Sequence, residues 1–167
     1  GELHDDIPRS LPECLEIALE TVCHLELLEE AGIGHGDIAY SNILIAPDGA
    51  VSLIDLDGFT HNDPQIPQPL TLGQRPMLAP ELRAANAGHP TPESDRFAIA
   101  VFLSHLLLGR YPTEGMGDTP AAVDHAMTQG AWPERHRPYG AGELAIEVLG
   151  PSLITLFDRA FSLTPSS

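Results

Sequence analysis

Residues 92–108 constrain the fold most, because they form a helix whose segment 98–108 is apolar on nearly every side. Thr91 is a typical N-cap, Pro92 suits the first helical position, and Gly109 lies just beyond the expected end. A helix without a polar face is covered on all sides by other elements. We therefore expect this helix at the centre of a mainly helical domain.

Three further helices are expected. Apolar residues at helical spacing predict an amphipathic helix over residues 11–31, with Gly32 where it would end. Such a helix packs on one face only. Two later helices are expected at about residues 120–129 and 151–161.

Between these helices the pattern changes. Short apolar runs at residues 43–45 and 51–54 are joined by proline, aspartate and glycine, which are turn formers, so we expect a small β-hairpin. Residues 60–74 are rich in proline, threonine, glutamine and asparagine and have no sustained period, which predicts an exposed ordered loop.

Composition narrows the class of protein. A chain of 167 residues is long enough for one domain with a hydrophobic core. Its formal charge of −16 predicts no binding to nucleic acid or anionic membranes. All eight basic residues are arginines, so no lysine chemistry is available.

Cys14 and Cys23 are about 13 Å apart along one helix and cannot pair. No leader opens the chain and residues 97–108 are too short to cross a bilayer, so we expect a cytoplasmic protein.

The residues that carry chemistry surround the expected hairpin. Asp37 follows His35 and Gly36, Asn42 comes five positions later, and Asp55 follows the second strand. A hairpin between Asn42 and Asp55 would return the second carboxylate to the side of the first. Phosphoryl transfer needs a carboxylate to orient the attacking hydroxyl and oxygen ligands for Mg²⁺, and these side chains provide both.

This segment resembles the catalytic and magnesium loops of the protein kinase superfamily, and the resemblance extends over almost the whole chain. Ala79-Pro80-Glu81 matches the motif that closes the activation segment, with Gly73 at the position of a preceding glycine. The resemblance implies a mainly α fold: the large C-terminal lobe of a divergent, bacterial serine/threonine kinase, with a hairpin that carries both loops. Asp95 would brace the backbone of the catalytic loop.

The same resemblance assigns catalytic and metal-binding roles. Asp37 and Asn42 would be the catalytic residues, with Asp37 orienting the hydroxyl of a protein substrate. Asn42 and Asp55 would hold Mg²⁺, with Asp57 as a further ligand. The reaction would transfer the gamma-phosphate of ATP to a serine or threonine.

Nucleotide and core positions follow in the same way. Glu2 would hydrogen-bond the ATP ribose, and Leu44 would form the floor under the adenine. His35 and Leu56 would belong to an internal hydrophobic column. Considered by its residue type alone, His35 is expected to be a core histidine, and the spacing of the histidines predicts no zinc site.

Three departures from the kinase pattern qualify these roles. Gly36 replaces the usual arginine, so activation by phosphorylation of Thr60 or Thr71 is not expected. Ala39 replaces a lysine that meets the transferring phosphate. The triplet at 55–57 is Asp-Leu-Asp instead of Asp-Phe-Gly.

The expected boundaries describe a fragment. Residues 1–167 would form a single lobe that begins after the kinase hinge and ends before the last helix. The small N-terminal lobe of the same polypeptide would be its missing partner, so the isolated chain would be inactive. Glu81 would lack its usual arginine partner.

Three functions remain open at this stage. The first is a protein serine/threonine kinase. The second is a small-molecule kinase of the aminoglycoside or choline type, against which the Ala-Pro-Glu motif and Asp95 argue. The third is a pseudokinase that serves as a binding scaffold.

Overall fold

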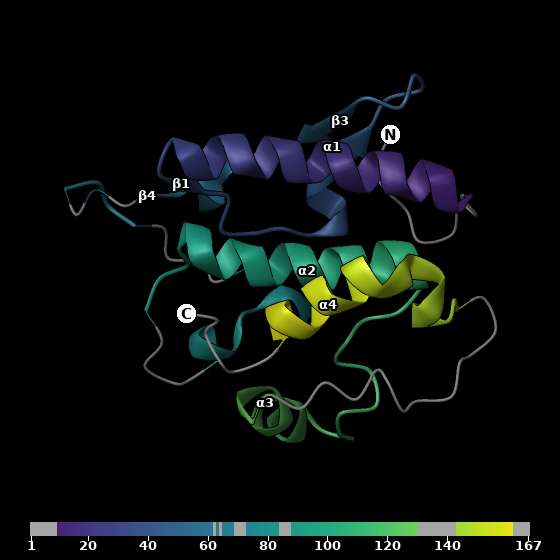
Figure 1. Cartoon of the computed structure of the whole chain (residues 1–167). Coiled ribbons are helices and arrows are strands. Elements are labelled where there is room, and N and C mark those ends of the chain that lie inside the picture. The colour runs from purple at the N-terminus through teal and green to yellow at the C-terminus, as the bar shows by residue number, and fades with distance from the viewer. Residues whose placement is uncertain are drawn as a thin grey trace.

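The computed structural model describes residues 10–61, 63, 65–68, 73–83, 88–129 and 143–161. Within these residues the chain is mainly helical, with two small antiparallel sheets. Helices α1 (Leu11–Glu30) and α4 (Gly150–Phe161) both pack against α2 (Pro92–Leu108), whereas α3 (Pro120–Thr128) lies apart from them (Figure 1). The expectation of a mainly helical fold is confirmed.

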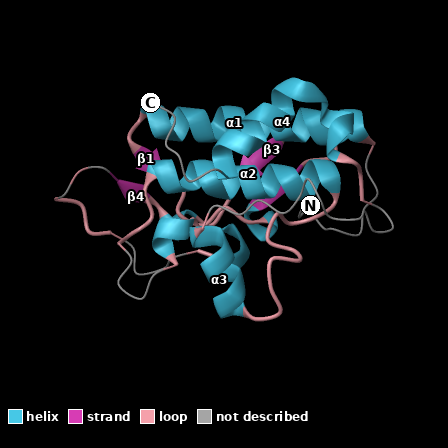
Figure 2. Cartoon of the chain, turned by 60° about the horizontal axis from the view of Figure 1, so that its bottom comes forward, coloured by secondary structure: helices cyan, strands magenta, loops and turns pink. Residues whose placement is uncertain are grey.

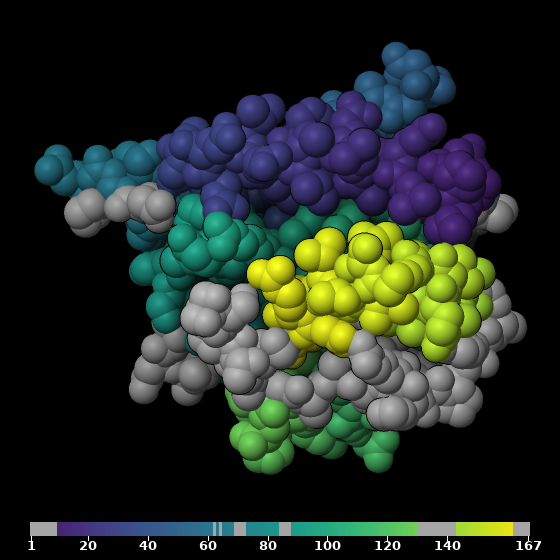
Figure 3. Space-filling model, in the orientation of Figure 1, coloured from purple at the N-terminus to yellow at the C-terminus, as the bar shows by residue number. Residues whose placement is uncertain are grey.

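Helix α2 is the central helix, as its sequence predicts. Thr91 and Ser94 form a reciprocal capping box at its start, and Gly109 ends it with a φ of 78°. Val101, Phe102 and Leu108 are completely buried. Figure 3 shows α1 and α4 covering much of α2 on one face of the molecule.

Helix α1 begins one residue after its N-cap, Ser10, whose capping box is completed by Glu13. Its buried residues recur at the spacing of one helical face, and that face packs toward α2. These residues are Cys14, Ile17, Ala18 and Thr21. Cys14 is buried, Cys23 is exposed, and no disulfide joins the two, as predicted.

The two later helices also begin and end close to the predicted residues. Thr119 caps α3 by accepting a hydrogen bond from the backbone of Ala122. Phe157 of α4 is buried in a cluster with Cys14 and Leu107. Figure 2 shows that α3 projects away from the other three helices.

No helix in the described part of the chain has the length and apolar character needed to cross a membrane.

The predicted hairpin is present. Strands β2 (Ile43–Ile45) and β3 (Val51–Leu53) pair antiparallel, with Ile43 opposite Leu53 and Ile45 opposite Val51. The backbone N–H of Ala46 donates to the carbonyl of Ala50 and closes the turn. Ile43 and Val51 place one face of the hairpin in the main core.

A second two-stranded sheet was not predicted. Strand β1 (Ile33–Gly34) pairs antiparallel with β4 (Thr60–His61). Thr60 is only 2% exposed, so the expectation of an exposed loop from residue 60 is wrong at its start. This buried position makes Thr60 a poor site for phosphorylation. Thr71 lies outside the described residues.

Candidate active site

The chain before Asp37 is fixed to the central helix by Asp95. The carboxylate accepts hydrogen bonds from the backbone N–H of His35 and from that of Gly36, the latter at 3.1 Å. Asp95 lies in the first turn of α2 and is 9% exposed. The expectation that Asp95 braces this backbone is confirmed.

The environment of Asp95 also changes its acidity. Burial raises the pKa of the carboxyl from its usual 3.8 to about 6, because the charged form loses its hydration. The hydrogen bonds from Gly36 and His35 oppose this rise, and the charge of Glu29 adds to it. Asp95 therefore titrates in a range where ordinary carboxyls are already ionised.

Gly36 occupies a position with no room for a side chain. Its φ is +76°, a left-handed conformation that favours glycine, and an added Cβ would lie 2.2 Å from the carbonyl oxygen of Gly58. This close approach brings the turn at Leu56–Gly58 against the backbone before Asp37. The absence of the arginine usual in the kinase pattern therefore has a steric reason in this chain.

Asp37 and Asn42 are in direct contact. The Nδ2 of Asn42 donates to the main-chain oxygen of Asp37 at 2.8 Å and to its Oδ2 at 3.2 Å. Asn42 is 5% exposed and ends the short turn Tyr40–Asn42. The oxygen Oδ1 of Asn42 accepts from the Ser41 hydroxyl at 3.2 Å.

The hairpin brings Asp55 back toward this pair. The N–H of Ile54 donates to the carbonyl of Asn42 at 2.9 Å, so Asp55 directly follows a residue bonded to Asn42. Asp55 has φ 62° and ψ 61°, and no other described non-glycine residue has a positive φ. Such a backbone is costly for aspartate and is often found at functional sites. The three predicted oxygen-bearing residues therefore lie on segments that contact one another.

His35 is a buried structural residue, as expected from its residue type. It is 1% exposed, and its Nε2 lies 3.0 Å from the carbonyl oxygen of Ile54. Burial lowers the pKa of His35 below its usual 6.5, although the Ile54 carbonyl and the charges of Asp37 and Asp55 oppose this effect. Both carboxylates therefore lie within electrostatic reach of the same ring.

The place of Leu56 in a hydrophobic column with His35 stays a prediction. Leu56 is 53% exposed, whereas Phe59 packs edge-on against the His35 ring with 5.6 Å between ring centroids. Leu56 begins the tight turn that approaches Gly36.

A second segment covers Asp37 from another side. An added Cβ on Gly73, whose φ is +76°, would lie 2.9 Å from the Gly36 carbonyl oxygen and 3.3 Å from Oδ1 of Asp37. That Oδ1 is buried and has no hydrogen-bond partner among the described residues. The cavity beside it measures about 20 Å³, which is about the size of one water molecule.

Comparison with known proteins identifies the class of domain. No model of a known protein family matches the chain. It is 27% identical over 125 residues to "Probable serine/threonine-protein kinase PknB" of Lactococcus lactis, a match that covers 74% of this chain and 20% of PknB. It is 30% identical over 141 residues to "Probable serine/threonine-protein kinase CE0033" of Corynebacterium efficiens, covering 80% of this chain and 21% of that protein. The chain carries a protein-kinase-like domain.

A third relative is named as an inactive kinase. The chain is 30% identical over 120 residues to "Probable inactive receptor kinase At5g10020" of Arabidopsis thaliana, which covers 70% of this chain and 12% of that protein. The kinase-like domain thus spans about a fifth or less of the length of these three relatives.

The side chains of Asn42, Asp55 and Asp57 carry oxygen atoms of the kind that would suit a nucleotide-bound Mg²⁺. Asp55 and Asp57 are exposed, whereas Asn42 is buried. Among the described residues, no three histidine, cysteine, aspartate or glutamate side chains form a group that could hold a metal on their own. Mg²⁺ commonly binds to one or two carboxylates, water and substrate phosphates, so this incomplete ligand set fits it.

The structure describes one of the two residues that the kinase resemblance assigns to ATP binding. Leu44 is half-buried in β2, where it lies opposite Ser52 of β3. Glu2 lies outside the described residues.

The Ala79-Pro80-Glu81 motif of the kinase-like domain forms a tight turn. Ala79 is 1% exposed, and the turn Pro80–Leu82 buries Leu82. Glu81 is exposed and forms no hydrogen bond or ion pair with any residue that the structure describes.

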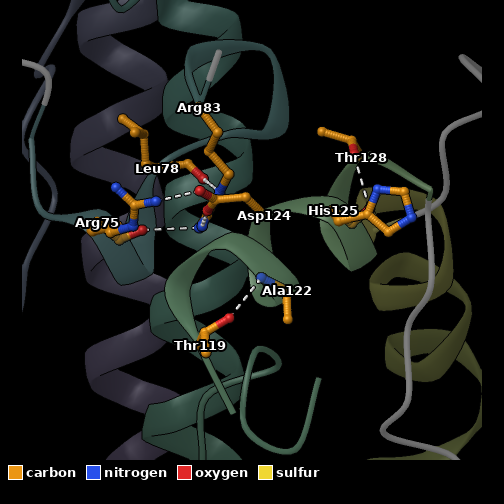
Figure 4. Close-up of polar contacts among 8 residues, drawn as sticks. All are labelled: Arg75, Leu78, Arg83, Thr119, Ala122, Asp124, His125 and Thr128. Atoms are coloured by element: carbon orange, nitrogen blue, oxygen red, sulfur yellow. Dashed lines mark hydrogen bonds and ion pairs between the residues drawn. The ribbon is translucent and has the colours of Figure 1, made fainter. Parts of the chain in front are cut away.

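One charged cluster next to the site was missed by the sequence analysis. Arg75 and Arg83, which flank this motif, both bind Asp124 of α3 (Figure 4). The three residues are distant in sequence and fit no local pattern. Only the folded arrangement brings them together.

Proposed function

We propose that this chain is the catalytic lobe of a Mg²⁺-dependent protein kinase that transfers the gamma-phosphate of ATP to a serine or threonine hydroxyl. The observation that carries this proposal is the contact of Asn42 with Asp37 on one side and with the backbone before Asp55 on the other. Phosphoryl transfer needs those three oxygen-bearing residues near one another.

Asp37 would hold the hydroxyl of the substrate and accept its proton while the oxygen–phosphorus bond forms and ADP leaves. Its Oδ2 already receives a hydrogen bond from Asn42, which fixes the orientation of the carboxylate. Asp95 would keep the preceding backbone in place through His35 and Gly36. In this role Asn42 would be a catalytic residue, because it contacts Asp37 and would also hold the metal.

Asn42, Asp55 and Asp57 would hold Mg²⁺, which would neutralise charge on the ATP phosphates when bound. Leu44 would contact the adenine and Glu2 the ribose, by resemblance to kinases. We further propose that residues 1–167 form one lobe and that a second lobe of the same polypeptide completes the nucleotide site.

The test uses the gene-encoded protein, including any residues outside this chain. Wild type should transfer labelled phosphate from Mg-ATP to a generic serine-containing protein, and Asp37→Asn should lower the rate at least about 100-fold, because the proton acceptor is lost. Asp118→Asn removes an exposed carboxylate outside the site and is the matched control. An Asp37→Asn rate equal to that of the control would refute the assignment.

A pseudokinase is the second candidate. Ala39 is 1% exposed and stands where kinases of this type carry a phosphate-contacting lysine, and the chain has no lysine. Similarity to a receptor kinase named as inactive points the same way. Calorimetry would separate the two: Mg-dependent ATP binding with no phosphate transfer to proteins or small molecules would favour the scaffold.

A further inference from the structure

Helix α3 is attached to the segment at residues 73–83 through one shared carboxylate. Arg83 donates from Nη1 to Oδ1 of Asp124 at 2.9 Å, and the Nη2 of Arg75 donates to Oδ2 of the same residue (Figure 4). The side chain of Arg83 is 2% exposed, that of Asp124 20%, and that of Arg75 59%. The Arg83 pair is therefore largely shielded from water, whereas Arg75 lies at the surface.

Arg83 connects α3 to the backbone of this segment. Its Nε donates to the carbonyl of Leu78 and its Nη2 to the carbonyl of Arg75, both at 2.8 Å. Asp124 is the only carboxylate that pairs with Arg83 among the described residues. A buried cation left without its counter-charge is unfavourable, so Asp124 keeps the guanidinium in position to hold these two carbonyls.

The held segment lies against the proposed catalytic residue. Gly73 approaches Gly36 and Oδ1 of Asp37 closely, as described above. The Nε2 of Gln74 donates to the hydroxyl of Ser41 at 3.3 Å. Residues 73 and 74 therefore contact the loop that carries Asp37.

We propose that Asp124 is a positioning residue that, through Arg83 and Arg75, holds residues 73–79 against the catalytic loop and so sets how a protein substrate approaches Asp37. The substrate part of this inference rests on the proposed kinase function. The part that concerns the backbone rests on the contacts alone.

Hydrogen exchange tests the backbone part on the chain itself. The amides of Met77 and Leu82 are hydrogen-bonded within this segment and serve as reporters. Asp124→Asn should speed their exchange at least about tenfold and leave residues 98–108 of α2 unchanged. Asp118→Asn, which removes a nearby exposed charge, should change neither. Faster exchange confined to α3, or equal exchange in both variants, would overturn the proposal.

A second variant tests whether unfolding of α3, and not loss of the Arg83 contacts, could explain faster exchange. Arg83→Lys leaves Asp124 in place but cannot make the three hydrogen bonds of the guanidinium, so the same reporters should exchange faster while α3 keeps its protection. Unchanged reporters in this variant would also overturn the proposal.

Steady-state kinetics of the gene-encoded protein test the substrate part. Asp124→Asn should raise the KM for a protein substrate about threefold or more and leave the KM for ATP unchanged, and Asp124→Glu should restore it. Two unchanged KM values, or a KM for ATP that rises together with the KM for the protein substrate, would contradict the substrate role. A wild type that transfers no phosphate would instead refute the proposed function, and the exchange result would still decide the backbone part.

Discussion

Two aspartates on two helices hold the two segments that meet at Asp37, and they do so by different means. Asp95 of α2 is buried and accepts hydrogen bonds from neutral backbone N–H groups. Asp124 of α3 is partly exposed and binds two arginines. The backbone of His35 and Gly36 is thus attached to the core of the fold, and the segment at residues 73–83 is attached to an outlying helix through charge.

This difference predicts different responses to solution conditions. Salt screens exposed charges strongly and buried hydrogen bonds weakly, so only the Asp124 cluster should respond to ionic strength. The Asp95 carboxyl gains or loses its proton near pH 6, because its pKa is raised to about 6. The attachment of the His35 and Gly36 backbone to Asp95 should therefore respond to pH. The following four predictions test the comparison.

Removal of the Asp95 carboxylate should have the largest effect. Asp95→Ala leaves the backbone N–H groups of His35 and Gly36 buried without their acceptor, which should lower the free energy of unfolding by about 4 kcal/mol. Glu93→Ala, in the exposed part of the same helical turn, is the control and should cost less than about 1 kcal/mol. Urea unfolding at pH 7 measures both, and similar losses would show that Asp95 is not a special attachment.

The pH dependence of stability should also report Asp95. Between pH 4 and 6 the folded protein holds a proton on Asp95 that the unfolded chain has released, so stability should fall as pH rises through this range. A pKa raised from 3.8 to about 6, at about 1.4 kcal/mol per pH unit, amounts to a loss of about 3 kcal/mol at most. Asp95→Asn should lack this slope.

His35 contributes a slope of opposite sign, because its lowered pKa favours folding as pH rises toward 6.5. The wild type and Asp95→Asn share this contribution, so their difference isolates Asp95. Parallel stability curves for the two proteins would contradict the raised pKa.

In the Asp124 cluster, the buried arginine should matter more than the exposed one. Arg83→Met leaves Asp124 and the carbonyls of Arg75 and Leu78 without this donor, and we expect a loss of about 2 kcal/mol in the free energy of unfolding. Urea unfolding checks this value. If Arg83→Met lost less free energy of unfolding than Arg75→Met, the buried arginine would not be the more important of the two.

The smallest effect is expected for Arg75→Met. An exposed ion pair contributes about 0.5 kcal/mol, so the loss should be near that value at low salt and should vanish at about 1 M NaCl. Unfolding measured at both salt concentrations tests this. A loss that persists in high salt would mean that Arg75 acts through packing instead of charge.

Most elements could be predicted because their signals are local. The cap Thr91 and the glycine after α2 fix the ends of that helix through neighbouring residues, and the turn formers between β2 and β3 fix the hairpin. Asp37, Asn42 and Asp55 could be selected because their order along the chain resembles a known pattern. Their roles in catalysis and metal binding remain predictions.

The sequence alone therefore determined the helices, the hairpin and the residues to consider together, because periodicity, capping and turn chemistry act over a few neighbouring positions. Tertiary structure decided the pairing of β1 with β4, the packing of Phe59 on His35, and the meeting of Arg75 and Arg83 with Asp124. These contacts join residues distant along the chain, and their strength depends on burial and on the approach of one backbone to another. Neither quantity exists until the chain has folded.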